Sequence, residues 1–245
     1  MDIGTERQQL LEQIRQAADP GYKAGSVKVI HTQLKIYGVR VPQLREIARN
    51  WQRAHKDVTH EDLLDLVEML WDGESQEERA LGMELLVRYR RHIPDLTWGH
   101  FDRWRCKLDN WGLTDGLGSS ILAPWLLEDP RARLAHLRDL IADEDVWCRR
   151  LALVATTPIN RGHTGFTIPD LTLELVDRVK EERHPMITKA VSWALREMTK
   201  THPDQVATYL EENREVLAAH VVREVNNKLR TGLKGGKSTA GQNER

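Results

Sequence analysis

Apolar residues recur every three to four positions along most of the chain, which is the spacing of one face of an α-helix. No segment shows the strict apolar–polar alternation of a half-buried strand. Helices are predicted over about 5–18, 22–34, 97–108, 110–127, 130–142, 144–156, 170–182, 185–201, 203–213 and 216–230, with others through 44–51 and from Thr59 and Ser75. The pattern therefore predicts an all-α protein.

Polar residues at the ends of these segments give the expected boundaries. Thr5 to Gln8 resembles a capping box, and Thr59 and Ser75 each precede acidic residues in a first helical turn. Residues 157–169 contain two glycines and two prolines and are predicted to be the longest internal loop. The stretch 233–245 is rich in Gly, Lys, Ser and Asn, and we expect it to be a disordered tail.

Short connectors between helices predict antiparallel helix pairs. A pair every roughly 35–45 residues fits degenerate HEAT-like repeats stacked as an α-solenoid, although no strict sequence repeat is visible. We expect one such domain over residues 1–232.

Composition excludes several classes of protein. The chain has a net charge of −1, so a nucleic-acid binder of this composition must segregate its charge. Cys106 and Cys148 form no CxxC motif, and the ten histidines lack ligand spacing, so we expect no metal site and a reducing compartment. Phosphate-loop, dinucleotide and hydrolase motifs are missing, and no cofactor is predicted. Without a long apolar run we expect a soluble, cytoplasmic protein that makes no membrane contact.

The segment 110–127 carries the first candidate chemistry. On a helix, Trp111, Asp115, Gly118 and Ser119 fall on the side opposite Leu113, Leu117 and Ile121. A carboxylate one turn after an indole, beside small residues, is a surface that a ligand could approach closely. The alternative is an exposed aspartate that pairs with a neighbouring arginine.

Three further groups of residues could contact a phosphate backbone. Trp193 lies among Lys189, Arg196 and Lys200, opposite an apolar arc, and an aromatic ring among cations suits a sugar–phosphate chain. Arg150 lies at the edge of a buried arc, and Arg45, Arg49 and Arg53 repeat at i,i+4 spacing. The alternatives are helix packing for Trp193, a structural ion pair for Arg150 and a solvated face for the arginine row.

Four motifs, taken together in order and spacing, give the chain a resemblance to the DNA alkylation repair family of HEAT-like-repeat DNA glycosylases over most of residues 5–230. They are Gly38-Val39-Arg40-Val41-Pro42 with Leu44-Arg45, Asn110-Trp111 followed by Asp115, Trp147-Cys148-Arg149-Arg150, and the stretch from Lys189 to Glu197. The resemblance implies a right-handed superhelix with a concave DNA-binding face, and a bacterial enzyme that is associated with the nucleoid when bound to DNA.

The same resemblance implies roles for individual residues. Asp115 would be catalytic, with Trp111 and Trp193 packing around the deoxyribose of the lesion. Arg150 would hold the DNA, and Lys189, Arg196, Arg45 and Arg49 are further expected DNA contacts. Two departures from the family bear on substrate range: Asn110 replaces a tryptophan, and an aliphatic residue near Val29 replaces an aromatic one.

The implied reaction is hydrolysis of the N-glycosidic bond of cationic N3- or N7-alkylated purines in duplex DNA by a monomeric enzyme. Because such a base already carries positive charge, it leaves without a general acid, and one carboxylate can stabilise the oxocarbenium-like sugar. A lysine positioned to form a Schiff base is not evident, so we expect a monofunctional glycosylase. The alternatives are a non-catalytic HEAT-like scaffold and a protein that binds distorted DNA without excision.

Overall fold

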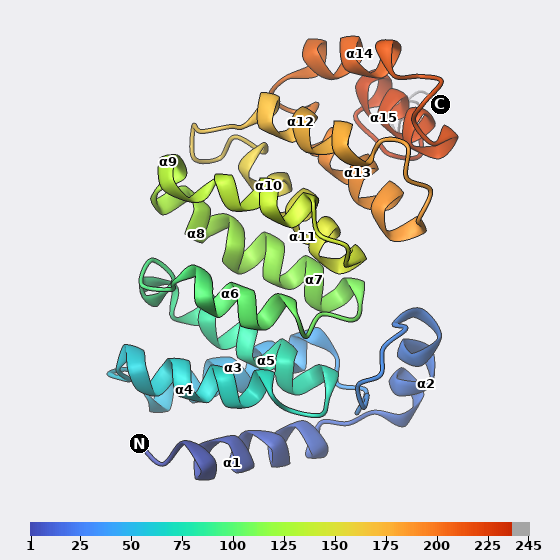
Figure 1. The fold of residues 1–245 in the computed structure, drawn as a ribbon. Coiled ribbons are helices and arrows are strands. Elements are labelled where there is room, and N and C mark those ends of the chain that lie inside the picture. Colours follow the sequence, from blue (N-terminus) through green and yellow to red (C-terminus); the bar gives the residue numbers. More distant parts are fainter. Residues whose placement is uncertain (237–245) are drawn as a thin grey trace, which may run out of the picture. The chain divides into compact units, whose positions relative to one another are not determined.

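The structure is a computed structural model that describes residues 1–236, and these residues form helices with one isolated bridge, between Lys35 and Ser75, as their only β-type pairing. The predicted all-α class is confirmed (Figure 1). The helices form two compact units, Met1–Glu128 and a second one that begins at Asp129, and each is described by itself. The single domain over 1–232, the right-handed superhelix and its concave face concern the arrangement of the whole chain, and they remain predictions.

Unit 1 consists of two rows of helices. Its elements are α1 (Ile3–Gln16), α2 (Pro20–Val29), α3 (Val41–Ala54), α4 (His60–Trp71), α5 (Gln76–Arg88), the 3₁₀ turn η1 (Arg90–His92), α6 (Trp98–Arg105), α7 (Trp111–Leu117), the π-helical turn η2 (Gly118–Leu122) and α8 (Ala123–Glu128). Helices α3, α5 and α7 pack side by side, while α1 and α4 cover them from one side. This arrangement is that of stacked helix pairs.

Helices α3, α5 and α7 run in the same direction. Hydrogen bonds join the N-terminal ends of all three, and another bond joins the C-terminal ends of α3 and α5. The Glu77 carboxylate at the start of α5 accepts N–H bonds from Gly38 (2.7 Å) and Val39 (3.2 Å), just before α3. At the other end, Gln52 of α3 donates to the Arg88 carbonyl of α5 (2.8 Å). The start of α7 is bonded to Gln76, the first residue of α5. The three N-terminal ends therefore share one edge of unit 1.

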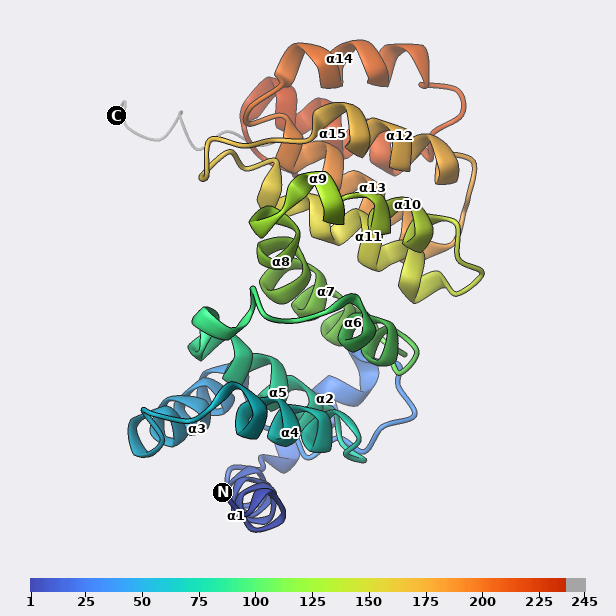
Figure 2. The same ribbon diagram turned by 60° about the vertical axis from the view of Figure 1, so that its left-hand side comes forward.

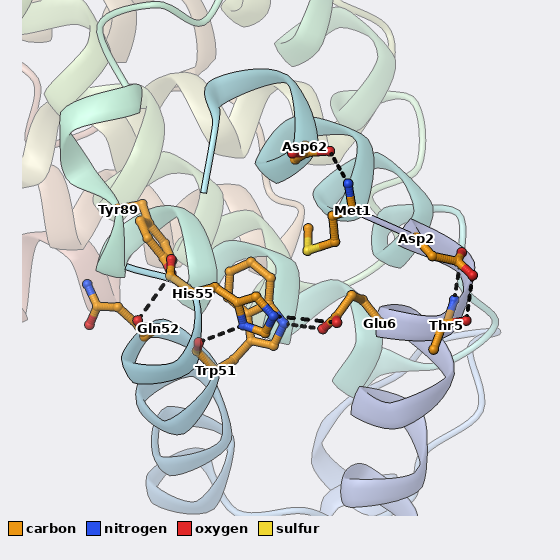
Figure 3. Close-up of polar contacts among 9 residues, drawn as sticks. All are labelled: Met1, Asp2, Thr5, Glu6, Trp51, Gln52, His55, Asp62 and Tyr89. Carbon is orange, nitrogen blue, oxygen red and sulfur yellow. Dashed lines mark hydrogen bonds and ion pairs between the residues drawn. The ribbon is translucent and has the colours of Figure 1, made fainter. Parts of the chain in front are cut away.

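The core of unit 1 is filled by leucines and large aromatic side chains. The largest fully buried ones include Trp71, Phe101 and Trp104. Burying such rings removes much apolar surface from water, which is the main stabilising contribution. Figure 3 shows how α1 joins this core: Glu6 accepts a bond from Trp51 Nε1 (2.8 Å), and the terminal amine lies 3.4 Å from Asp62.

Unit 2 repeats the two-row plan. Its elements are α9 (Pro130–Arg133), α10 (Ala135–Ile141), α11 (Val146–Ile159), α12 (Pro169–Val179), α13 (Pro185–Met198), α14 (Pro203–Glu212) and α15 (Ala219–Thr231). Helices α11, α13 and α15 pack against one another, and α10, α12 and α14 lie along their outer side (Figure 2). The predicted apolar arc of α13, which includes Ile187, Val191 and Ala194, is buried.

Several predicted helix boundaries are wrong. Helix α2 ends at Val29 rather than near residue 34. The first helix begins earlier than expected, because Asp2 rather than Thr5 is its N-cap and accepts the Thr5 N–H. Helix α11 runs through Pro158 to Ile159, into the segment predicted as loop. Proline cannot donate to the Val154 carbonyl four residues back. The Thr157 hydroxyl donates to that carbonyl instead (2.9 Å), so the last turn keeps its hydrogen bonds.

Other sequence predictions have mixed outcomes. The caps at Thr59 and Ser75 are confirmed. Residues 237–245 of the predicted tail lie outside the described residues. Within residues 1–236, no helix is both long and apolar enough to cross a membrane.

Candidate functional site

The start of α7 is fixed by a buried cap. Asn110, fully buried, accepts N–H bonds from Gly112 (2.9 Å) and Leu113 (3.1 Å), and its amide donates to Gln76 (2.9 Å). An asparagine at this position satisfies the free N–H groups of the first turn. The departure from the family at Asn110 therefore has a structural role here, because the side chain caps the helix that carries Trp111.

Trp111 connects α7 to α2. Its ring is half-buried, and Nε1–H donates to the Val29 carbonyl at the end of α2 (3.2 Å). The indole also lines an open pocket of about 380 Å³, together with Tyr22, Gly25, Val29 and Arg40. One face of the candidate site is therefore an aromatic wall held by a tertiary hydrogen bond.

Asp115 lies one helical turn after Trp111 and is half-buried. Residues four apart lie on the same face of a helix, about 5–6 Å between their Cβ atoms. The two candidate groups predicted from the sequence in this segment are therefore brought together by one helix.

The helix changes from α to π geometry at Gly118, three residues after Asp115. Residues Gly118–Leu122 form a π-helical turn, and the Ser119 hydroxyl donates to the Asp115 carbonyl (2.6 Å). Pro124 has no N–H to donate to Ser120, and its ring would clash with that carbonyl in a regular α-helix. The wider π turn accommodates the proline, and such turns are frequent at functional sites.

Tyr22 and Arg40 were not expected as site residues, and Arg40 was noted only as part of a motif. The Arg40 guanidinium lies 4.5 Å over the Tyr22 ring, and its Nη2 is 3.2 Å from Asp19. Backbone N–H groups at the start of α2, that of Tyr22 above all, together with the Arg40 guanidinium, lower the pKa of the Asp19 carboxyl. The sequence pointed to an aliphatic residue near Val29, whereas the structure places an aromatic ring of the same helix in the pocket.

Two contacts set the position of α2. The Asp109 carboxylate, next to the α7 cap, accepts bonds from the Thr32 hydroxyl (2.5 Å) and the Gln33 N–H (2.8 Å). At the other end, Gly38 has φ +89° and its carbonyl accepts the Asp19 N–H (3.1 Å). A Cβ at Gly38 would lie 2.6 Å from the Asp19 carbonyl oxygen. Only glycine fits there without strain.

In unit 2, Trp193 is half-buried on α13, and within residues 1–236 its indole nitrogen forms no hydrogen bond. Of the cations predicted around it, Lys189 is exposed. Arg196 donates to Ser192 (3.2 Å) and lies 3.9 Å from Glu224. Lys200 pairs with Glu197 (2.5 Å). Much of the expected positive charge on this face is therefore compensated by acids.

Arg150 has a clear structural contact. It is only 5% exposed and donates from Nη1 to the Met186 carbonyl at the start of α13 (2.6 Å). This bond joins α11 to α13. Its role as a DNA contact remains a prediction.

The arginine row of α3 is also partly compensated. Arg45 pairs with Glu84 (3.1 Å) and Arg49 with Glu46 (2.8 Å). Both side chains remain about half exposed and can reach a polyanion. A phosphate that bound either arginine would compete with the glutamate already paired to it.

One histidine cluster in unit 1 was not expected from sequence spacing. His60, His92 and Asp95 place one possible metal-ligand atom each within 4.8 Å of one another. However, the Arg91 guanidinium donates to His92 Nε2 (3.1 Å), and burial followed by the Arg91 charge lowers the pKa of His92. A neighbouring guanidinium repels a metal cation, so this cluster is a poor cation site.

The fold defines an all-α protein of stacked helix pairs. A profile of the DNA alkylation repair enzyme family matches residues 10–229, and the chain belongs to that family. Membership of this family assigns the chain to the repair of alkylated DNA. No curated protein matches it by sequence.

Solved structures show the same fold. One is described as a predicted DNA alkylation repair enzyme from Enterococcus faecalis, with a TM-score of 0.69 and 18% identity over 86% of this chain and 95% of that one. Another is smu.31 from Streptococcus mutans UA159, with a TM-score of 0.51 and 16% identity over 89% of this chain and 96% of that one.

Proposed function

We propose that this protein is a monofunctional DNA glycosylase that hydrolyses the N-glycosidic bond of cationic N3- and N7-alkylated purines in duplex DNA. The observation that carries the proposal is the pairing of Trp111 and Asp115 on consecutive turns of α7, beside an open aromatic pocket. Membership of the DNA alkylation repair enzyme family supports the substrate class. As part of the proposal, the protein acts as a monomer in the cytoplasm, on the DNA of the nucleoid.

The reaction needs few catalytic groups from the protein, because the base already carries a positive charge. As the glycosidic bond breaks, its electron pair goes to the cationic base, which leaves neutral, and C1′ becomes oxocarbenium-like. Water then adds to C1′ and one proton is released. The Asp115 carboxylate stabilises the cationic sugar and orients that water. The electron-rich ring of Trp111 favours the same positive charge.

The residues of unit 2 have supporting roles in this proposal. Trp193 packs on a deoxyribose, and Arg150, Lys189 and Arg196 hold the sugar–phosphate chain. These roles rest on the family resemblance together with the half-buried indole and exposed lysine of α13.

The test is release of 7-methylguanine from methylated duplex DNA, with Asp115→Asn compared with the unmodified protein. This change keeps the shape of the side chain and removes its charge. We expect excision to fall by roughly 10²-fold or more, the size typical of losing one preorganised electrostatic group. DNA affinity should stay similar or rise, because a negative charge beside phosphates is lost.

The matched control is Asp139→Asn, which removes an exposed carboxylate on α10 of unit 2. This control should excise at the unmodified rate. If Asp115→Asn did so too, Asp115 would have no place in the mechanism. A protein that bound DNA but released no base would instead be a DNA-structure binder.

A further inference from the structure

A second pocket lies at the C-terminal ends of α3 and α5, where five cationic side chains converge. The pocket has a volume of about 460 Å³ and includes Tyr89 in its lining. The cations are Arg53, Lys56, Arg88, Arg90 and Arg91. No acidic residue lines this pocket. The concentration of like charge is unusual in a protein whose net charge is −1.

The cations of this pocket are not compensated from within the protein. Among residues 1–236, none of the five is ion-paired, and the side chains of Arg53, Lys56, Arg88 and Arg90 form no hydrogen bond. The Nε atom of Arg88 is buried and has no partner. A buried donor without a partner is costly, and an acceptor oxygen placed in this pocket would satisfy it.

The alternative explanation is that these cations only complement helix C-termini, which carry partial negative charge. Arg91 does this, since its Nη2 donates to the Lys56 carbonyl (3.1 Å). The Tyr89 hydroxyl already donates to the His55 carbonyl at the end of α3 (2.7 Å), beside the Gln52 carbonyl seen in Figure 3. The His55 and Lys56 carbonyls are thus bonded to Tyr89 and Arg91. The side chains of the other four cations donate to no carbonyl among residues 1–236 and are available for an external anion.

The cationic pocket and Trp111 lie at opposite edges of the same row of helices in unit 1. Helices α3, α5 and α7 run in the same direction, so Trp111 lies at their N-terminal edge and the cationic pocket at the C-terminal edge. The 13 residues of α5 span about 20 Å. A DNA strand has a phosphate about every 3.4 Å along the helix axis, so this length corresponds to roughly six phosphates.

We propose that this pocket binds backbone phosphates of duplex DNA on the flank of the lesion, with Arg53 and Arg90 as its outer contacts. A phosphate has several acceptor oxygens and can satisfy more than one guanidinium at once. The duplex as partner rests on the proposed function. The phosphate chemistry rests on the unpaired cations alone, and a free oligophosphate is the other source of the same group.

The experiment measures binding of a fluorescent, undamaged duplex at several salt concentrations. The variant is Arg53→Gln/Arg90→Gln, at two exposed positions. Losing two phosphate contacts should weaken binding at least tenfold near 0.1 M salt. It should also reduce the slope of log affinity against log salt by about 1.8, since each contact contributes about 0.9. If this variant does not fold, Lys56→Gln/Arg90→Gln gives the same test.

The matched control is Arg103→Gln/Arg138→Gln, which removes the same charge from exposed arginines paired with Glu68 and Glu174. This control should keep its affinity within about twofold. Equal affinity and slope in the two double variants would overturn the proposal. A second result would also overturn it: tripolyphosphate binds the unmodified protein but not Arg53→Gln/Arg90→Gln, while both proteins bind DNA with the same affinity. Because the duplex is undamaged, the outcome is independent of 7-methylguanine release.

Discussion

Trp111 and Trp193 are both half-buried tryptophans with the same proposed task, but the protein holds them differently. Trp111 sits at the start of a seven-residue helix, and its indole is bonded to the Val29 carbonyl of α2. Trp193 lies inside the 14-residue helix α13, and no hydrogen bond fixes its ring among residues 1–236. One ring depends on a neighbouring element for its position, and the other depends only on its own helix.

The difference matters because α2 is a weakly packed partner. None of its residues is buried, and Val27 and Val29 are 51% and 59% exposed. Nine residues of α13, by contrast, are buried. Elements with few buried apolar contacts open at low free-energy cost. The position of Trp111 is therefore sensitive to changes in α2, whereas that of Trp193 should tolerate changes nearby.

Among the changes that test this comparison, Trp111→Ala should have the largest effect. This change removes the aromatic wall of the pocket and frees the end of α2, so excision of 7-methylguanine should fall by roughly 10- to 100-fold. Hydrogen exchange at residues 20–29 should become faster. In Trp193→Ala, exchange of this segment should match that of the unmodified protein. Unchanged exchange in Trp111→Ala would show that the indole does not hold α2.

A smaller effect is expected from Gly38→Ala, which acts on α2 from its other end. The positive φ and the close Asp19 carbonyl should make this change cost roughly 1–3 kcal/mol. In a protein of this size that lowers Tm by several degrees. The control is Gly25→Ala, where a Cβ would meet nothing within 4 Å. Inside a helix it should raise stability slightly. Equal Tm values for the two variants would contradict this account.

The smallest effect is expected from Trp193→Ala. If the indole packs on a deoxyribose, affinity for duplex DNA that contains an abasic site should fall about fivefold, or about 1 kcal/mol. The fold should hold, because the buried arc of α13 consists of other side chains. A large loss of Tm with unchanged affinity would instead make Trp193 a packing residue.

The sequence by itself determined the helices and much of the candidate site. A period of 3.6 residues is a local property, so the buried arc of α13 and the common face of Trp111 and Asp115 could be predicted from spacing alone. The caps at Thr59 and Ser75 could also be predicted, because each capping side chain accepts a hydrogen bond from an N–H group only three residues away. The end of α11 was missed, since the Thr157 hydroxyl replaces the bond that Pro158 cannot make.

Only the tertiary structure decided which charges and rings meet across helices. Tyr22, Arg40 and Trp111 come from three separate segments, and no periodicity relates them. The same holds for charge: Arg45 and Arg196 lie near acids at Glu84 and Glu224, while Arg53 and Arg90 converge without one. A charged residue shows its sign in the sequence, but the neighbours that screen or reinforce it depend on how the helices pack.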